Sequence, residues 1–192
     1  MKGMEPYCSS NFDMPLDLQI KAKTLCWEYN QTGPKDKEKR AELLKQLFGD
    51  CHPLTFIEPS FHCDYGFNIH TQGLAVMNYN CVILDTSPVE IGPNVFIGPG
   101  TVLACSGHAL LGFQRAEGIG TSAPIRIGKD VWIGANCTVC GGVTIGDGTV
   151  IGAGSVVNRD IPAGVVAAGV PCRVIREISS EDRVFPWSAE KE

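Results

Sequence analysis

The stretch IGKDVWIGANCTVCGGVTIGDGTVIGAGSVVN, residues 127–158, repeats a pattern every six residues. An aliphatic residue leads each repeat, and a small residue follows it in all but the last: Ile127-Gly128, Ile133-Gly134, Val139-Cys140, Ile145-Gly146, Ile151-Gly152 and Val157-Asn158. A helix would place residues six apart on opposed faces, so the period is not helical. A short strand and a turn, repeated, instead point one aliphatic side chain per repeat toward a shared axis. Because one coil cannot bury its apolar side alone, successive coils are expected to stack into a parallel β-helix.

The same pattern occurs upstream and keeps its phase across a gap. The earlier repeats begin at Ile91, Ile97 and Leu103, and Ile91 lies six whole repeats before Ile127. Residues 104–126 therefore interrupt the repeat without shifting it, and we expect them to form a loop that leaves the solenoid. A weaker set at Ile69, Ala75 and Cys81 is out of register and predicts an irregular coil. An antiparallel sandwich would show strands every 8–12 residues, which the strict six-residue register does not fit.

The first part of the chain has a helical period instead. Leu18, Ala22, Leu25, Cys26 and Tyr29 share one face of a helix, and Asp13 and Pro15 suit its start. A break at 30–34 precedes a second helix that runs to Phe48, with Gly49 placed to cap it. We therefore expect a helical segment over 1–60, a β-helix over 61–178 and a C-terminal tail over 179–192. The helices either only pack on the solenoid or also contribute to a binding site.

Composition limits the possible partners. Hydrophobic residues make up 44% and charged residues 19%, which is a globular balance, and the net charge of −5 gives no reason to expect nucleic acid or an anionic membrane as partner. The first residues lack the apolar core of a secretory signal, and no apolar run reaches the roughly 18 residues of a membrane span. With nine cysteines at irregular spacing, we expect reduced thiols and a cytoplasmic protein.

Several motifs together resemble one enzyme family. DYGFNIH (64–70), NYNCVILDTSPVEIG (78–92), SGH (106–108) and IPAGVVAAGVPCRVIREI (161–178) are similar to the maltose and galactoside O-acetyltransferases. TLCWEYN (24–30) resembles the end of the helical segment that precedes the solenoid in that family, and the similarity covers about residues 7 to 184. The resemblance implies a mainly β protein, a left-handed parallel β-helix of triangular section. It also implies a homotrimer with active sites between subunits that uses acetyl-CoA to acetylate a sugar hydroxyl.

The resemblance assigns two catalytic residues. Direct acetyl transfer needs a base for the acceptor hydroxyl and a donor for the oxyanion. Of His52, His62, His70 and His108, only His108 lies within the break between repeats, and its SGH motif matches the family's general base. Asn78, the first residue of NYN, matches an asparagine that helps to hold the tetrahedral intermediate, and an amide donates without titrating.

The candidate acceptor and coenzyme residues rest partly on the same resemblance and partly on residue chemistry, since a carboxylate such as that of Asp64 or Asp85 can accept from two vicinal hydroxyls. Asp64, Asn78, Asp85 and Thr86 are candidates for the acceptor site, and the aspartate at 64 and threonine at 86 favour a maltose-type or nodulation-factor-type acceptor over a β-galactoside. Trp132, Ala135 and Ala153 match positions along the coenzyme arm. The phosphates of coenzyme A require cations and polar groups, and the candidates near the last repeat are Asn158, Arg159, Arg173 and Arg176.

Other readings remain open at this stage. Cys137-x-x-Cys140 and Cys105-x-x-His108 could suggest a metal, but the first pair occupies small-residue positions of the repeat, and a metal would block His108 as a base. We therefore expect no metal. The alternative functions are acetylation of a non-sugar acceptor such as serine or an antibiotic, a zinc carbonic anhydrase on the same solenoid, and a non-catalytic scaffold.

Overall fold

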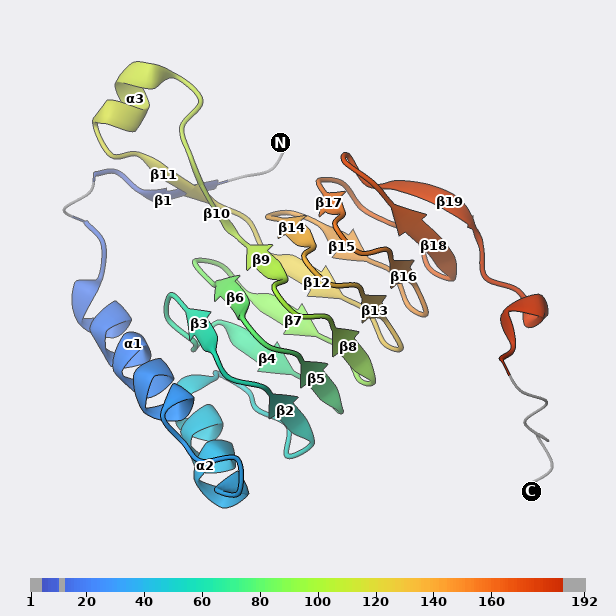
Figure 1. Ribbon diagram of the computed structural model, residues 1–192. Coiled ribbons are helices and arrows are strands. Elements are labelled where there is room, and N and C mark those ends of the chain that lie inside the picture. Colours follow the sequence, from blue (N-terminus) through green and yellow to red (C-terminus); the bar gives the residue numbers. More distant parts are fainter. Residues whose placement is uncertain (1–4, 11–12, 185–192) are drawn as a thin grey trace.

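The computed structural model describes residues 5–10 and 13–184 (Figure 1). After a short strand, β1 (Glu5–Cys8), the chain forms helices α1 (Leu16–Asn30) and α2 (Lys37–Leu47) and then winds through a series of short strands. A short helix α3 (Gly112–Ala116) projects from the middle of the solenoid, and a 3-10 helix η1 (Ser180–Asp182) follows its last strand. Among the described residues no helix combines the length and the apolar character needed to cross a membrane.

Three sheets form the three faces of the solenoid. The four-stranded sheet consists of β4 (Ile69–Thr71), β7 (Val89–Ile91), β12 (Ile125–Ile127) and β15 (Thr144–Ile145). The seven-stranded sheet consists of β2 (Thr55–Ile57), β5 (Ala75–Met77), β8 (Val95–Ile97), β13 (Trp132–Ile133), β16 (Val150–Ile151), β18 (Val165–Ala168) and β19 (Arg173–Glu177). The five-stranded sheet consists of β3 (Phe61–Cys63), β6 (Cys81–Leu84), β9 (Val102–Ala104), β14 (Thr138–Cys140) and β17 (Val156–Val157). The chain visits these faces in turn, and the fold is the expected left-handed parallel β-helix.

The strand register explains why the early repeats are out of phase. In the C-terminal coils, paired strands lie eighteen residues apart, as in Ile133↔Ile151 and Val139↔Val157. In the N-terminal coils the spacing is twenty, as in Phe61↔Cys81 and Ile69↔Val89. The early coils are therefore wider than three hexapeptides, and the extra residues all fall at the corner that leads from the five-stranded to the four-stranded sheet.

The inward positions of the three faces are mostly apolar, with aliphatic residues in the later coils, and the corners contain small polar residues. The leading residues Ile91, Ile133 and Ile151 are fully buried. At the corners, buried hydroxyls replace apolar groups and donate to backbone carbonyls: Thr101 Oγ1 bonds the Gly134 carbonyl at 3.1 Å, and Thr149 Oγ1 bonds that of Pro162 at 2.7 Å. A buried carbonyl that lacks a partner costs free energy, so these hydroxyls stabilise the turns.

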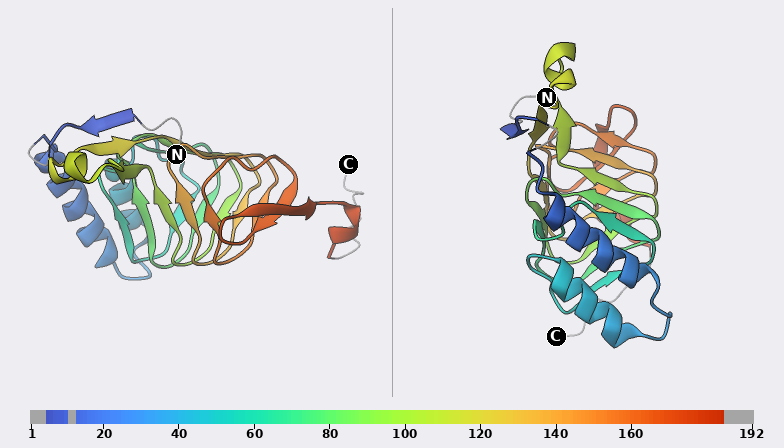
Figure 2. Two further views of the ribbon diagram at one scale, coloured as in Figure 1. Left: turned by 90° about the horizontal axis from the view of Figure 1, so that it is seen from above. Right: turned by 90° about the vertical axis from the view of Figure 1, so that its left-hand side faces the viewer.

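The two helices close the N-terminal end of the solenoid, as Figure 2 shows. Asn30 fixes α1 to the first coil because its side chain accepts from the Phe61 N–H (2.8 Å) and donates to the Phe61 carbonyl (2.9 Å). The buried face of α1 differs from our expectation: Leu18 is 45% exposed, and Gln19 is buried in its place. Gln19 lies in line with Ala22, Cys26 and Tyr29, and its amide donates to Tyr65 Oη at 3.3 Å.

Gly49 has a different role from the helix cap that the sequence suggested. Helix α2 ends at Leu47, Phe48 is already extended, and Gly49 does not adopt the left-handed conformation of a capping glycine. A Cβ at Gly49 would lie 2.1 Å from the Phe67 carbonyl oxygen. Glycine is required here because the backbone of residue 67 approaches so closely.

The segment 104–126 leaves the solenoid and forms a small antiparallel sheet with the start of the chain. Strands β10 (Ser106–His108) and β11 (Gly120–Ser122) pair with each other, and β1 (Glu5–Cys8) adds to β11 (Figure 1). The N-terminal segment therefore includes a strand as well as helices. The solenoid also starts earlier than residue 61, because β2 already pairs with β5.

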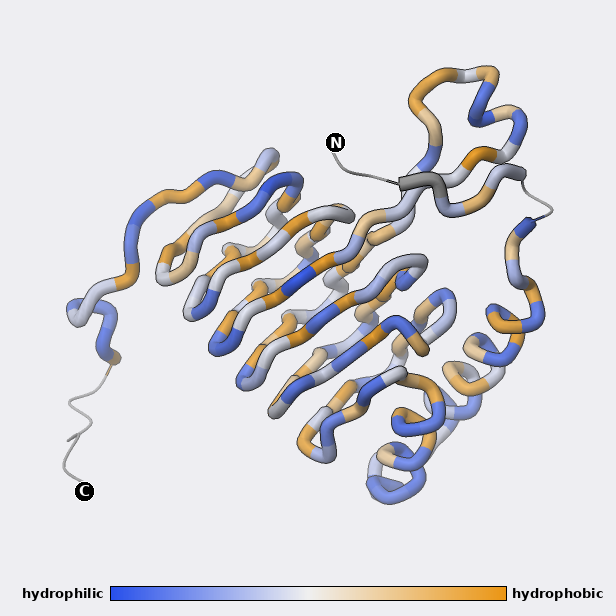
Figure 3. The backbone as a smooth tube through the Cα atoms, turned by 180° about the vertical axis from the view of Figure 1, so that it is seen from behind, coloured by the Kyte–Doolittle hydropathy of each residue, from blue (hydrophilic) through white to orange (hydrophobic). Residues whose placement is uncertain are grey.

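The outward faces of two sheets differ in polarity. On the seven-stranded sheet, adjacent outward side chains form one continuous apolar ladder: Phe56, Val76, Phe96, Trp132, Val150 and Val166. On the four-stranded sheet the matching column is polar: His70, Glu90, Arg126 and Thr144. Figure 3 shows how hydrophobic and hydrophilic residues alternate along the coils, as expected for strands with one buried face.

Candidate active site

One corner of the solenoid is larger than the others and contains most of the predicted acceptor and catalytic residues. We call it the wide corner; it comprises residues 64–68, 85–88 and 105–124, which connect the five-stranded to the four-stranded sheet in three successive coils. Asp64, Asp85, Thr86 and His108 all lie on it. The sequence placed these residues in separate motifs, and the coil register stacks them at one edge.

His108 ends strand β10 at the base of the projecting loop. Its backbone pairs with Gly120 of β11, which fixes the start of the loop, and its side chain is exposed. Its imidazole makes no hydrogen bond to any residue in the described part of the chain. An imidazole that is held at its backbone and open to solvent can accept a proton from an incoming hydroxyl.

Asp85 is buried, so it positions the wide corner from inside. Its Oδ1 accepts the backbone N–H groups of Asp64 (3.0 Å) and Tyr65 (2.9 Å), and the Asn68 amide donates to its carbonyl oxygen at 2.7 Å. Its Oδ2 has no partner among the described residues. Burial, only partly offset by these hydrogen bonds, raises the pKa of Asp85 to about 6. The burial of Asp85 does not fit direct contact with an acceptor, which our sequence analysis had suggested.

Asp64 and Thr86 are more accessible than Asp85. Asp64 is half-buried; burial raises the pKa of its carboxyl, and the nearby Lys23 lowers it. The Ser122 hydroxyl on β11 forms hydrogen bonds with two other hydroxyls. Its Oγ lies 2.6 Å from Thr86 Oγ1 and 2.6 Å from Ser87 Oγ. These hydroxyls link the loop that carries His108 to the coil that carries Asp85.

Sequence reasoning missed Ser87 and Ser122, and also the tyrosines beneath the corner. The Tyr7 and Tyr65 hydroxyls form a hydrogen bond with each other, which joins β1 to the wide corner. Burial and this bond raise the pKa of the Tyr7 hydroxyl well above its usual value. Tyr65 directly follows Asp64 in the DYG motif, but nothing in a single sequence indicates that Tyr7 reaches it.

Asn78 lies at a different corner, between β5 and β6, where the seven-stranded sheet meets the five-stranded one. Its Oδ1 accepts the N–H of Tyr79 at 2.8 Å, which leaves the amide NH₂ group to donate elsewhere. Strand β6 separates Asn78 from Asp85, and its four residues span roughly 13 Å. Within one chain, the structure therefore does not bring Asn78 and His108 together.

The residues predicted to line the coenzyme arm lie at or beside the Asn78 corner. Ala135 and Ala153 stack there in successive coils, and Trp132 precedes them on the apolar ladder with its side chain 56% exposed. A Cβ at Gly134 would lie 2.6 Å from the Ala153 backbone nitrogen, so glycine lets these coils approach closely.

The predicted phosphate contacts lie near the C-terminal end of the solenoid, and two of them already have partners. Asn158 and Arg159 are exposed after β17. On β19, Arg173 Nη1 donates to the carbonyl of Cys172 at 2.6 Å. Arg176 binds both carboxylate oxygens of Asp182 at 2.8 and 2.7 Å, so its guanidinium is partly occupied and less available to a phosphate than predicted.

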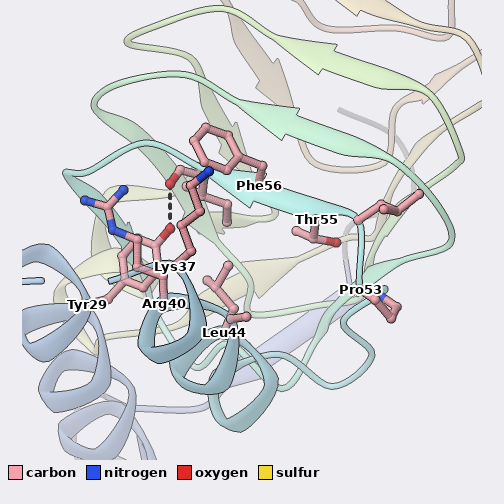
Figure 4. A pocket seen from close by; sticks show the side chains of 10 residues that line it. Tyr29, Lys37, Arg40, Leu44, Pro53, Thr55 and Phe56 are labelled. Carbon is pink, nitrogen blue, oxygen red and sulfur yellow. Dashed lines mark hydrogen bonds between the residues drawn. The ribbon is translucent and has the colours of Figure 1, made fainter. Parts of the chain in front are cut away.

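A cavity elsewhere does not coincide with this site. It has a volume of about 320 Å³, lies between α2 and β2, and includes Tyr29, Lys37, Arg40, Leu44 and Phe56 in its wall (Figure 4). None of the predicted catalytic, acceptor or coenzyme residues lines it. Within the described ranges there is also no group of three or more His, Cys, Asp or Glu side chains arranged to hold a metal ion.

Comparisons with known proteins agree with the fold and motifs. A family model for the bacterial transferase hexapeptide (six repeats) matches residues 124–159, and one for the maltose acetyltransferase hexapeptide capping motif matches residues 5–52. Galactoside O-acetyltransferase of Escherichia coli (strain K12) is 46% identical over 169 residues, which cover 88% of this chain and 83% of that protein.

Solved structures give the same result. A maltose O-acetyltransferase from Clostridium difficile 630 is 41% identical, with a TM-score of 0.84 over 85% of this chain and 88% of that one. A galactoside acetyltransferase in complex with coenzyme A is 42% identical, with a TM-score of 0.82 over 91% of this chain and 87% of that one. The chain has the hexapeptide solenoid and the capping helices, and it is similar to these proteins along nearly its whole length. It therefore belongs to the hexapeptide-repeat O-acetyltransferase family that includes the galactoside and maltose O-acetyltransferases.

Proposed function

We propose that this protein transfers the acetyl group of acetyl-CoA to a hydroxyl of a sugar acceptor, with His108 as the general base. The observation that carries the proposal is the wide corner, which places an exposed histidine in the same stack as a half-buried carboxylate, Asp64, and a hydroxyl, Thr86. Structures of similar proteins with bound coenzyme A and acetyl-CoA support acetyl-CoA as the acetyl donor.

The reaction is a direct transfer in this proposal. The imidazole of His108 removes the proton of the acceptor hydroxyl as its oxygen attacks the thioester carbonyl. The amide NH₂ of Asn78 donates to the oxyanion of the tetrahedral intermediate, since its Oδ1 already accepts the Tyr79 N–H. The C–S bond then breaks, and the imidazolium returns its proton to the leaving thiolate of coenzyme A.

The acceptor lies at the wide corner in this account. The Asp64 carboxylate accepts from sugar hydroxyls, and Thr86 adds a hydroxyl that Ser122 orients. Asp85 holds the backbone of Asp64 in place through the 3.0 Å hydrogen bond from its N–H. An aspartate at 64 and a threonine at 86 favour a maltose-type or nodulation-factor-type acceptor.

Coenzyme A lies along the Asn78 corner, beside Trp132, Ala135 and Ala153. The small alanines let the pantetheine arm approach the backbone, and Trp132 covers it from the apolar ladder. Its phosphates bind near the end of the solenoid, where Asn158, Arg159 and Arg173 are exposed. Arg176 binds a phosphate only when its ion pair with Asp182 is broken.

The active protein is a homotrimer in this proposal, because one chain holds the two halves of the site on separate corners. The apolar ladder and the projecting loop offer the contact surfaces: Phe96 and Trp132 on the ladder, and Leu110 and Phe113 on the loop, are 46 to 82% exposed. Exposed apolar surface of this kind is typical of subunit interfaces. The nine cysteines are free thiols, which agrees with a cytoplasmic location.

A panel of acceptors tests the function. The wild-type protein is incubated with acetyl-CoA and, in turn, with maltose, glucose, a β-galactoside, serine and chloramphenicol, an antibiotic that contains no sugar. Release of coenzyme A is followed, and the acetylated hydroxyl is identified by NMR. We expect turnover with maltose or glucose to exceed the rate with serine or the antibiotic. Preferred acetylation of serine or the antibiotic would assign a non-sugar acceptor. Binding of coenzyme A without any turnover would indicate a non-catalytic scaffold.

A further inference from the structure

Two buried thiols face each other where α1 packs on the first coil. Cys26 of α1 and Cys63 of β3 are 2% and 6% exposed, and their sulfur atoms lie 3.6 Å apart. A disulfide requires a sulfur separation of about 2.05 Å. A movement of roughly 1.5 Å at the helix would close the gap between the 3.6 Å observed here and that bond length.

The same thiols line a cavity, so small reagents have a route to them. The cavity has a volume of about 310 Å³, and its wall includes Cys26, Cys63, Lys23 and Trp27. Lys23 and Trp27 are exposed, which opens this wall to solvent. The Asp85 carboxylate raises the pKa of both thiols, so the hydrogen bond within the pair is what favours a thiolate at Cys26.

The electrostatics of the pair distinguish the two sulfur atoms. The hydrogen bond with Cys63 lowers the pKa of Cys26, while the same bond and burial raise the pKa of Cys63. Cys26 therefore ionises first, with the Cys63 thiol as its hydrogen-bond donor. By contrast, burial raises the pKa of the other thiols in the interior of the solenoid, such as Cys81 and Cys105.

We propose that Cys26 and Cys63 form an oxidisable dithiol, a modification site at which hydrogen peroxide converts the pair into a disulfide that ties α1 to the solenoid. The Cys26 thiolate attacks the peroxide oxygen, the O–O bond breaks, and Cys26 becomes a sulfenic acid as the hydroxide takes a proton and leaves as water. The Cys63 sulfur, giving up its proton, then attacks the Cys26 sulfur and expels a second water. Two thiols are oxidised and one peroxide is reduced.

The bond would act directly on the wide corner. Cys63 immediately precedes Asp64, whose N–H is fixed by Asp85 at 3.0 Å. The disulfide would join two residues that lie 37 positions apart in the sequence, and such a constraint stabilises a fold mainly by restricting its unfolded state. Oxidation is thus expected to stiffen the contact between the helical segment and the first coil.

Peptide mapping tests the site on the whole protein without any assay of activity. The reduced protein is treated with one equivalent of hydrogen peroxide, the remaining thiols are alkylated, and the digest is analysed by mass spectrometry. We expect the Cys26–Cys63 linked peptide as the main product before the other seven cysteines are oxidised. Cys63→Ser should abolish the linked peptide, and Cys51→Ser, which changes a half-buried thiol elsewhere, should leave it unchanged.

A second measurement uses phenylarsine oxide, a trivalent arsenical that binds two neighbouring thiols at once. We expect one equivalent to bind the reduced wild-type protein and the Cys51→Ser variant, and none to bind Cys63→Ser. Oxidation of Cys26 to higher acids without a link to Cys63, scattered linkages among other cysteines, or arsenical binding that survives Cys63→Ser would overturn the proposal.

Discussion

At the scale of single residues, Asp85 shows how a carboxylate can serve a site that it does not contact. It is fully buried, one oxygen binds the N–H groups of Asp64 and Tyr65, and the other has no described partner. Burial raises its pKa from 3.8 to about 6 in the folded protein. The folded state therefore binds a proton more tightly than the unfolded state, and the stability contributed by this group is lost as pH rises through 3.8 to 6.

Two substitutions of Asp85 test separately how its charge and its hydrogen bonds affect the stability of the protein. Asp85→Asn keeps the oxygen that accepts two N–H groups and removes the buried charge, so the variant should be more stable than wild type at pH 8 by up to ~2 kcal/mol, with little difference near pH 4. Asp85→Leu leaves both N–H groups unpaired and should lose ~2–4 kcal/mol at either pH. Urea unfolding at the two pH values measures both. A loss of stability in Asp85→Asn at pH 8 would show that the charge itself is favourable.

His108 is the residue on which the proposed chemistry depends. His108→Ala should lower kcat by ~10²–10⁴-fold, the usual effect of removing a general base, and leave the dissociation constant of coenzyme A nearly unchanged. Steady-state kinetics and calorimetry give the two numbers. His62→Ala, which removes an exposed histidine from β3, is the matched control and should behave like wild type. Near-normal turnover in His108→Ala would remove this residue from the mechanism.

At the scale of the structural element, the corners decide how closely the coils stack. A Cβ at Gly134 would lie 2.6 Å from the Ala153 nitrogen and 3.0 Å from the Ile151 carbonyl oxygen, both of which are backbone atoms. At Gly154 the backbone has φ +72°, but a Cβ would meet nothing within 4 Å. Other corners already hold asparagine in this conformation, as Asn136 does at φ 54°.

These two glycines form a matched pair of tests. Gly134→Ala should destabilise the protein by ~1–3 kcal/mol, because the coils cannot separate without losing backbone hydrogen bonds. Gly154→Asn should change stability by less than ~0.5 kcal/mol, since asparagine tolerates the left-handed conformation and has space. Thermal unfolding of both variants decides the matter. Equal losses in the two would mean that the conformation, and not the close approach, sets the requirement for glycine.

The repeating elements were predictable from the sequence because equivalent positions of successive repeats occupy equivalent places in the solenoid, so the same residue types recur. The parallel β-helix could be predicted from the six-residue repeats, and the projecting loop from the interruption between the repeats at Leu103 and Ile127. The left hand came from the family resemblance. The width of the early coils could not, because the extra residues at 64–68 have no period of their own. The strand β1 and the buried Gln19 were also missed, since each depends on one distant contact, with β11 and with Tyr65.

The candidate site was predictable only in part, and for a similar reason. Resemblance indicated His108, Asn78 and Asp64 by their motifs. Carboxylate chemistry suggested Asp85 as a contact of the acceptor, but the structure buries it. Arg176 was expected to meet a phosphate and instead binds Asp182. A motif reports residue identity, whereas exposure and pairing depend on neighbours that a single sequence does not reveal.

At the scale of the whole molecule, the two halves of the proposed site lie on different corners of one chain. His108 is on the wide corner, and Trp132 and Asn78 are separated from it by the five-stranded sheet. The exposed apolar ladder and the loop residues Leu110 and Phe113 provide surfaces on which subunits can associate. In a threefold assembly, the wide corner of one subunit would face the coenzyme corner of its neighbour.

The most direct test of this shared site is activity in mixed oligomers. His108→Ala and Trp132→Ala are first assayed separately to establish that each is inactive. The two variants are then unfolded together in equal amounts and refolded, and the mixed species are verified by native mass spectrometry. If the two residues of one site come from different subunits, roughly a quarter of the clefts receive both intact residues, and about that fraction of wild-type acetyl transfer should return. No recovery in verified mixed trimers, or full activity in a proven monomer, would contradict the account.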